Sequence, residues 1–267
     1  MSRISIIHYL KLIYRSCLFI AATVIYTVNR AANAEKIFFD EEHRPFILFL
    51  IWLVFVVEML FRFFPSKFES MGCQKQFKRN FKPVDPDKNR ASRSTWKSTL
   101  LVAVLWIALN GIIGALYYTD IIDEGILVLI SLAFSVCDMI CILFFCPFQT
   151  WIMKNKCCTS CRIYNWDYAM MFTPMIFIKD AFALSILFFA VVLLLRWELT
   201  AHIHPERFSE ETNACLSCGR CEEKLCHHKK QLKQFLKKNH RKIYSFMEEK
   251  LGEHTNNINR KKNDKRS

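Results

Sequence analysis

Glycine and proline are scarce in this chain of 267 residues, which contains 6 Gly and 7 Pro, and its 24 acidic residues are outnumbered by 37 Lys and Arg. So little glycine excludes a collagen-like or low-complexity chain, and an apolar content of 52% excludes intrinsic disorder. The sequence also lacks the P-loop, G-x-G-x-x-G, H-E-x-x-H and G-x-S-x-G motifs and shows no internal repeat. Any enzymatic chemistry would therefore depend on its 12 cysteines.

Long apolar stretches are what the sequence does have. The mean hydropathy is +0.14 despite a net charge of +13, so the charges must be segregated from the apolar segments. Four segments approach or exceed the roughly 20 residues that a membrane helix needs: Phe46–Phe64, Thr99–Tyr118, Ile126–Pro147 and Asp180–Trp197. A fifth, Ser16–Val28, has 13 residues and would need snorkelling flanks to span. We therefore predict an all-α, polytopic integral membrane bundle of four or five helices in the cell membrane.

The domain organisation follows from these segments and from the composition between them. Residues 1–34 form either a membrane helix or signal anchor, or a cleaved signal peptide that ends at Ala32-Asn33-Ala34. Residues 35–198 form the helical bundle, with a basic loop at 65–98 and a cysteine-containing loop at 148–168. Residues 199–252 form a Cys-rich segment and a basic amphipathic helix, and residues 253–267 form a disordered tail.

The distribution of Lys and Arg predicts the orientation. The N-terminus carries 3, the loop 65–98 carries 9 and the loop 148–168 carries 3, whereas Glu35–Arg44 carries 2 and Thr119–Gly125 carries none. Because short cytoplasmic loops are enriched in these residues, the N-terminus is expected inside.

The segment from residue 196 onward complicates this topology. It has 72 residues with 17 Lys and Arg, and a fifth crossing would place it outside. The alternative is that Tyr168–Trp197, which Pro174 and the pair Lys179-Asp180 interrupt, forms a re-entrant or broken helix. On length alone, we expect a single crossing.

Charged residues inside the apolar segments are candidate functional residues, because each costs about 2.5–3.5 kcal/mol to insert. Glu58 is four residues from Arg62, and the two can pair near the inner interface. Lys179 and Asp180 are expected to form an interfacial pair. Asp138 is the sharpest candidate, because no basic residue lies within a helical turn of it.

Asp138 lies between two cysteines, Cys137 and Cys141, which share one helix face. Cys146, at the end of the same helix and nine residues beyond Cys137, points roughly opposite. Two thiols and a carboxylate suit a transient metal or redox site, while ordinary helix packing is the alternative. With Glu58, these residues make up the candidate intramembrane polar site.

The loop after this helix contains Cys157, Cys158 and Cys161. The C-x2-C pair can hold one edge of a tetrahedral metal site. It can equally be a redox dithiol whose thiolate the flanking Lys156 and Arg162 favour. Unliganded thiols at a reducing membrane surface remain the third interpretation.

The tail carries a denser cluster of thiols. Four of them within twelve residues can supply every ligand of a zinc ion or a four-iron cluster: Cys215, Cys218, Cys221 and Cys226. The spacing C-x2-C-x2-C-x4-C departs by one residue from the bacterial ferredoxin run, and the trailing proline is missing. In a reducing compartment we expect metal ligation, whereas outside the cell the same thiols would form two disulfides.

These features lead to one functional hypothesis and two alternatives. The first is a membrane protein that handles iron, zinc or an iron–sulfur cluster in transport, storage or electron transfer. The alternatives are a membrane thiol-disulfide oxidoreductase that uses Cys158 and Cys161, and a non-enzymatic scaffold. The expected partners are the bilayer, with anionic lipid at the basic segments, and a membrane protein. Nucleic acid is not expected, because no binding motif accompanies the charge.

Overall fold

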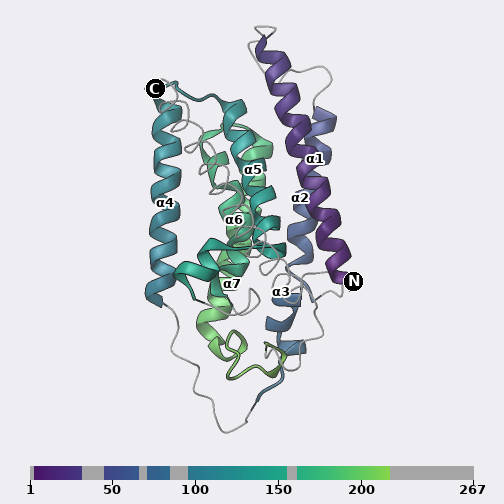
Figure 1. Ribbon diagram of the computed structural model, residues 1–267, viewed down its shortest axis with the longest axis vertical. Coiled ribbons are helices and arrows are strands. Elements are labelled where there is room, and N and C mark those ends of the chain that lie inside the picture. Colours follow the sequence, from purple (N-terminus) through teal and green to yellow (C-terminus); the bar gives the residue numbers. More distant parts are fainter. Residues whose placement is uncertain (1–2, 32–44, 66–70, 85–95, 155–160, 217–267) are drawn as a thin grey trace, which may run out of the picture. The chain divides into compact units, whose positions relative to one another are not determined.

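The computed structural model describes residues 3–31, 45–65, 71–84, 96–154 and 161–216, and within these ranges the chain is helical, without a strand. The longer elements are α1 (Arg3–Ala31), α2 (Pro45–Phe61), α3 (Met71–Gln76), α4 (Trp96–Tyr118), α5 (Glu124–Leu143), α6 (Asp167–Phe172) and α7 (Ala181–Ile203). The short helical turns used below are η2 (Phe148–Ile152), η4 (Arg162–Trp166), η5 (Thr173–Phe177) and η7 (Ala214–Leu216). Figure 1 shows the long helices side by side as a bundle.

Four of the described helices are long and apolar enough to cross a membrane: α1, α4, α5 and α7. This confirms the prediction of an all-α chain with membrane-length helices. The described part of α2 is also apolar but shorter, with its apolar stretch at Ile51–Phe61. Local signals mark two of the helix starts. The Asp123 side chain accepts a hydrogen bond from the Ile126 N–H, and the Asp180 side chain accepts two from the first turn of α7.

The first membrane-length helix is longer than the sequence suggested. The apolar stretch runs over Ile6–Val28, 23 residues, whereas we expected a span of 13 residues that begins after Arg15. The expectation was wrong because Arg15 was taken as a flanking charge. Its side chain is only 1% exposed and lies inside the helical bundle.

The segment Tyr168–Trp197, for which we expect a single crossing, is not one continuous helix, and only its second part, α7, is long and apolar enough to span. Two short elements, α6 and η5, end at Phe177, and α7 begins only at Ala181 with Asp180 as its N-cap. Pro174 has no N–H to donate, so it favours the break in the α-helix. The interruption lies where Pro174 and the pair Lys179-Asp180 predict it, while the number of crossings stays a prediction. Asp180 caps a helix rather than serving only as a partner of Lys179.

The interrupted segment passes along the bundle from one end to the other. Near its start, the Asn165 amide donates to Gln76 of α3 at 2.7 Å. Near its end, the Phe177 ring lies 6.2 and 6.0 Å from those of Tyr117 and Tyr118, at the end of α4. The sixteen residues of η4, α6 and η5 would rise about 29 Å, close to the thickness of a bilayer core.

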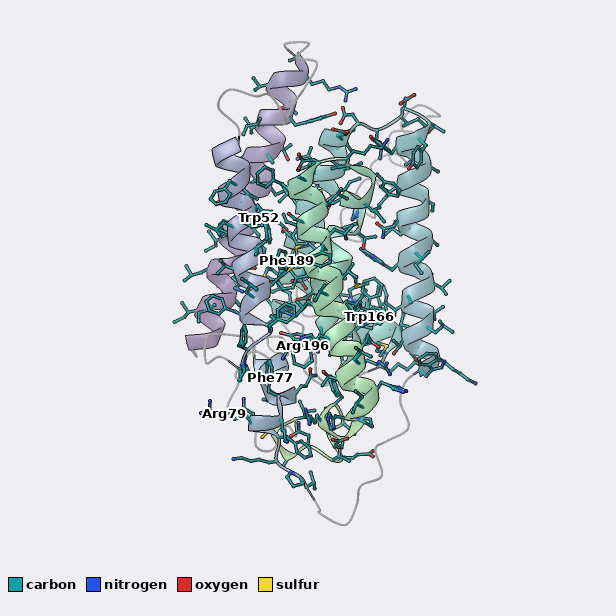
Figure 2. All side chains as sticks on the ribbon, turned by 180° about the vertical axis from the view of Figure 1, so that it is seen from behind. Trp52, Phe77, Arg79, Trp166, Phe189 and Arg196 are labelled. Atoms are coloured by element: carbon teal, nitrogen blue, oxygen red, sulfur yellow. The ribbon has the colours of Figure 1, made fainter. Side chains whose placement is uncertain are left out.

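The residues after α7 lie beside α3 and the residues that follow it (Figure 1). The Ala214 N–H donates to the Lys82 carbonyl at 2.8 Å, and the Asn213 amide donates to the Lys75 carbonyl at 2.9 Å. Figure 2 shows Phe77 and Arg196 near this end, with the Arg196 guanidinium 5.7 Å from the Phe77 ring centre. We call the end of the bundle that holds α3 and the residues after α7 the basic end. We call the opposite end, which holds the turn 119–124, the acidic end.

Candidate functional site

A buried arginine joins three helices in the middle of the bundle. Arg15 of α1 donates through Nη2 to Glu58 of α2 at 2.8 Å and through Nη1 to Asp138 of α5 at 3.2 Å. The same Nη1 also donates to the Ser135 carbonyl at 3.1 Å. An isolated guanidinium would not stay buried in an apolar bundle, so these acceptors compensate for its lost hydration.

The Glu58 carboxylate also contacts a hydroxyl and an ammonium group. The Tyr168 hydroxyl donates to it at 2.9 Å, and the Lys11 ammonium lies 3.4 Å from its other oxygen. Glu58 is therefore bound by cations of α1, in place of the expected pair with Arg62 of its own helix. The sequence-based pairing was too local, because spacing along one helix cannot show a charge supplied by another.

Arg62 forms a second buried ion pair, with Asp167 at the start of α6. Its two terminal nitrogens lie 2.9 and 2.5 Å from the two carboxylate oxygens, and both side chains are 5% exposed. The contact of Nη1 with Oδ1 is a hydrogen bond between two charged groups, and such bonds are stronger than those between neutral groups. The Tyr168 ring lies next to both pairs, with its centre 4.8 Å from the Arg62 guanidinium and 5.9 Å from that of Arg15.

Beside these ion pairs is a cavity of about 320 Å³, between α4, α5 and the turns that follow α5. Most of its wall is apolar or aromatic, including Trp106, Leu109, Phe134, Met170 and Met171. Its wall also contains two carboxylates and four thiols, Asp138, Asp167, Cys137, Cys141, Cys146 and Cys161. The volume is at the lower bound of pockets that hold small organic ligands.

The packing of α4 positions one side of this cavity. The helix packs mainly against η2 and η5, and the Trp106 ring meets the Phe134 ring of α5 at 5.0 Å. The Trp106 indole N–H donates to the Thr173 hydroxyl at 3.3 Å. On the same helix, the Asn110 amide oxygen is buried and has no hydrogen-bond partner among the described residues.

The structure brings three of the four predicted polar-site residues to the cavity wall: Cys137, Asp138 and Cys141. Glu58 lies behind them, linked to Asp138 through Arg15. The predicted direction of Cys146 is wrong. Because α5 ends at Leu143 rather than continuing to Pro147, the chain turns and Cys146 reaches the same cavity as Cys141.

Two of the predicted metal ligands fall within the described ranges. Cys161 is buried at the cavity, and the Cys215 thiol donates to the Asn80 carbonyl at 3.1 Å at the basic end. The other five lie outside the described residues: Cys157, Cys158, Cys218, Cys221 and Cys226. Across the described ranges, no three His, Cys, Asp or Glu side chains are arranged to hold a metal ion.

Four residues of the two buried groups around Arg15 and Arg62 were not identified from the sequence: Lys11, Arg15, Asp167 and Tyr168. A signal for the first two was present, because they are spaced i, i+4 and apolar residues lie on both sides of them. Asp167 and Tyr168 follow a loop and carry no comparable periodic signal.

No known protein family matches the chain, and neither curated proteins nor solved structures show significant similarity to it.

Proposed function

We propose that the chain is a multi-pass membrane protein whose basic end faces the cytoplasm. The loops 65–98 and 148–168 and the segment from residue 196 carry 9, 3 and 17 Lys and Arg. On the other side, Glu35–Arg44 carries 2, Thr119–Gly125 carries none, and Lys179 is one more. The interrupted segment supplies the additional pass that brings the residues after α7 to the basic end. The charge distribution then follows the positive-inside rule throughout.

In this membrane we propose that the protein is a thiol-disulfide oxidoreductase. It would exchange electrons between the dithiol Cys158/Cys161 and a lipid-soluble quinone bound in the cavity. The observation that carries this proposal is the position of Cys161, one half of the C-x2-C pair, in the wall of an apolar cavity that also holds Asp138. A dithiol beside an apolar pocket can reach a carrier that is dissolved in the bilayer.

The cavity suits a flat, lipophilic ring. Trp106 and Phe134 offer aromatic faces on α4 and α5, and aromatic rings stack favourably in offset or edge-to-face arrangements. The outer surface of α4 is apolar, with Leu105 and Ile107 among its exposed side chains. A carrier with an isoprenoid tail would keep that tail in lipid while its head group occupies the cavity.

The reaction balances in electrons and protons. Two thiols lose two electrons and two protons and form a disulfide, while the quinone takes up the same electrons and protons and becomes a quinol. Two carboxylates, Asp138 and Asp167, lie on the cavity wall. We assign the acceptance and return of the proton to Asp138, because it lies on α5 beside Cys137 and Cys141. Arg15 holds this carboxylate in place and links it to Glu58.

The test uses the purified full-length protein in lipid nanodiscs, reduced and then mixed with a short-chain benzoquinone. We expect one quinol per disulfide formed, and mass spectrometry should find Cys158 joined to Cys161. The variant Cys161→Ser should lose this reaction. The matched variant Cys17→Ser, which removes an exposed thiol on α1, should keep it. If both thiols remain fully alkylatable after quinone addition, the proposal is wrong.

Metal handling by the tail cluster is a second candidate, and the position of Cys215 favours it. This first thiol of the cluster lies at the basic end, close to Asn80. If that end is cytoplasmic, a reducing environment keeps thiols available as ligands for zinc, iron or an iron–sulfur cluster. Cys157, Cys158 and Cys161 would form an auxiliary site on the same side.

Elemental analysis of anaerobically purified protein tests this second candidate. We expect close to one zinc, or iron with acid-labile sulfide, per chain. The double variant Cys215→Ser/Cys218→Ser should lose the metal without losing the cavity reaction of Cys158 and Cys161. Protein that contains no stoichiometric metal would exclude it.

A further inference from the structure

Two more cysteines meet where α5 ends. The N–H groups of Phe144 and Phe145 both donate to the Ile140 carbonyl, at 2.8 and 3.2 Å, so the chain turns directly after Leu143. The turn brings the side chain of Cys146 into hydrogen-bond contact with that of Cys141. The two thiols are therefore neighbours, although the linear sequence separates them by five residues.

The surroundings of the two sulfurs differ. The Cys146 sulfur accepts a hydrogen bond from the Gln149 N–H at 3.4 Å, whereas Cys141 lies on the last turns of α5. A sulfur that accepts an N–H is better stabilised when it carries negative charge. Cys146 is thus the better leaving group of the two in thiol-disulfide exchange.

Both thiols face the same partners. Cys141 and Cys146 line the cavity together with Cys161 and Asp138. Cys161, one thiol of the C-x2-C pair, is buried and lies on the same cavity wall as Cys141 and Cys146.

We propose that Cys141 and Cys146 are a second redox dithiol, which takes electrons from Cys158/Cys161 and passes them to the quinone. This inference rests on the proposed oxidoreductase function and assigns two further catalytic residues to it. A second pair adjacent to the cavity explains why thiols cluster at the end of α5 as well as in the loop.

The exchange proceeds in three balanced steps. The Cys161 thiolate attacks the Cys141 sulfur of a Cys141–Cys146 disulfide, and Cys146 leaves as a thiolate. The Cys158 thiolate then attacks Cys161, which forms the Cys158–Cys161 disulfide and releases Cys141. Finally the Cys141/Cys146 dithiol gives two electrons and two protons to the quinone, which becomes a quinol while the Cys141–Cys146 disulfide forms again.

The first measurement is peptide mapping after oxidation with diamide, a chemical oxidant that needs no bound carrier. We expect a Cys141–Cys146 disulfide in the full-length protein. The double variant Cys146→Ser/Cys158→Ser removes Cys146, the partner of Cys141 in the disulfide, and Cys158, the thiol that releases Cys141 from Cys161. This variant should therefore accumulate a Cys141–Cys161 cross-link. Absence of both products overturns the inference, whatever the quinone assay shows.

The second measurement is the rate of quinone-dependent oxidation of Cys158 and Cys161. In Cys141→Ser and Cys146→Ser this rate should fall to that of buffer without protein. Cys17→Ser, which removes an exposed thiol of α1 that does not line the cavity, should keep the rate of the unchanged protein. If Cys141→Ser and Cys146→Ser retain full rate, the second dithiol is excluded while the oxidoreductase function stands. If the unchanged protein forms the Cys141–Cys146 disulfide with diamide but shows no quinone reaction, the function fails.

Discussion

The Arg15 guanidinium of α1 lies 3.2 Å from the Asp138 carboxylate of α5, although 123 residues separate the two in sequence. The contact holds the first helix against the helix that carries the cavity thiols. It also gives Asp138 the cation that no neighbour on its own helix supplies. The same guanidinium binds Glu58, so one arginine bridges two acids in an apolar bundle, and Lys11 supplies the second cation.

Replacement of this arginine should destabilise the protein strongly. In Arg15→Gln, Glu58 and Asp138 remain buried but lose their shared cation. Breaking a buried ion pair by removing one partner costs about 3–5 kcal/mol. The thermal midpoint of the protein in detergent should therefore fall sharply, as measured by the change in tryptophan fluorescence.

A matched arginine on the same helix provides the control. Arg30 pairs with Asp123 at 3.0 Å, but the two side chains are 61% and 40% exposed. Water screens an exposed pair, so Arg30→Gln should leave the midpoint nearly unchanged. Equal losses in Arg15→Gln and Arg30→Gln would show that the Arg15 cluster adds no special stability.

Loss of the cavity carboxylate should slow the reaction without emptying the site. Asp138→Asn keeps the shape of the side chain but removes a proton acceptor, and general acid–base groups typically contribute about 10²–10⁴-fold to rate. We expect quinone-dependent thiol oxidation to slow by about a hundredfold, with quinone affinity little changed.

Asp120, in the turn at the acidic end, provides a control variant for the loss of one carboxylate. Asp120 has φ of 56°, a conformation that asparagine also tolerates, so Asp120→Asn removes a carboxylate without backbone strain. Its reaction rate should equal that of the unchanged protein. A rate for Asp138→Asn that matches Asp120→Asn would remove Asp138 from the reaction.

Two glycines of α4 should respond oppositely to alanine. A methyl group at Gly114 would lie 2.5 Å from the Phe177 ring, whereas one at Gly111 would meet nothing within 4 Å. Overpacking costs about 1–3 kcal/mol, so Gly114→Ala should lower stability. Gly111→Ala should be neutral or stabilising by up to about 1 kcal/mol, because alanine is the better helix former. Denaturation in detergent compares them, and the reverse order would contradict the packing of η5 on α4.

The side of the membrane that holds the residues after α7 can be tested by labelling with a membrane-impermeant maleimide. Cysteines introduced at two exposed positions of the basic end, Lys82 and Glu211, should react only in inverted vesicles. A cysteine at Lys179 should react on intact cells. Labelling is compared with that of the unchanged protein. Reaction of Glu211→Cys on intact cells, with Lys82→Cys protected, would mean that the interrupted segment does not cross.

Much of the helical architecture could be predicted from the sequence. Both ends of α4 and the start of α7 were placed within three residues, because apolar length and flanking charge are local properties, whereas α7 runs on from the predicted Trp197 to Ile203. The end of α5 was not, since a turn after Leu143 leaves no composition signal in a run that stays apolar to Pro147. That difference of four residues decides whether Cys146 faces away from Cys141 or contacts it.

By itself, the sequence determined that the chain is helical, rich in membrane-length apolar segments and basic on alternate connections. These properties follow from residue composition along a single segment. Only the tertiary structure decided that Arg15 compensates Asp138, that the segment before α7 is interrupted, and that thiols from α5 and the following loop share one cavity. A buried charge or thiol acquires its chemistry from neighbours on other helices, and helical periodicity describes only the face of one helix.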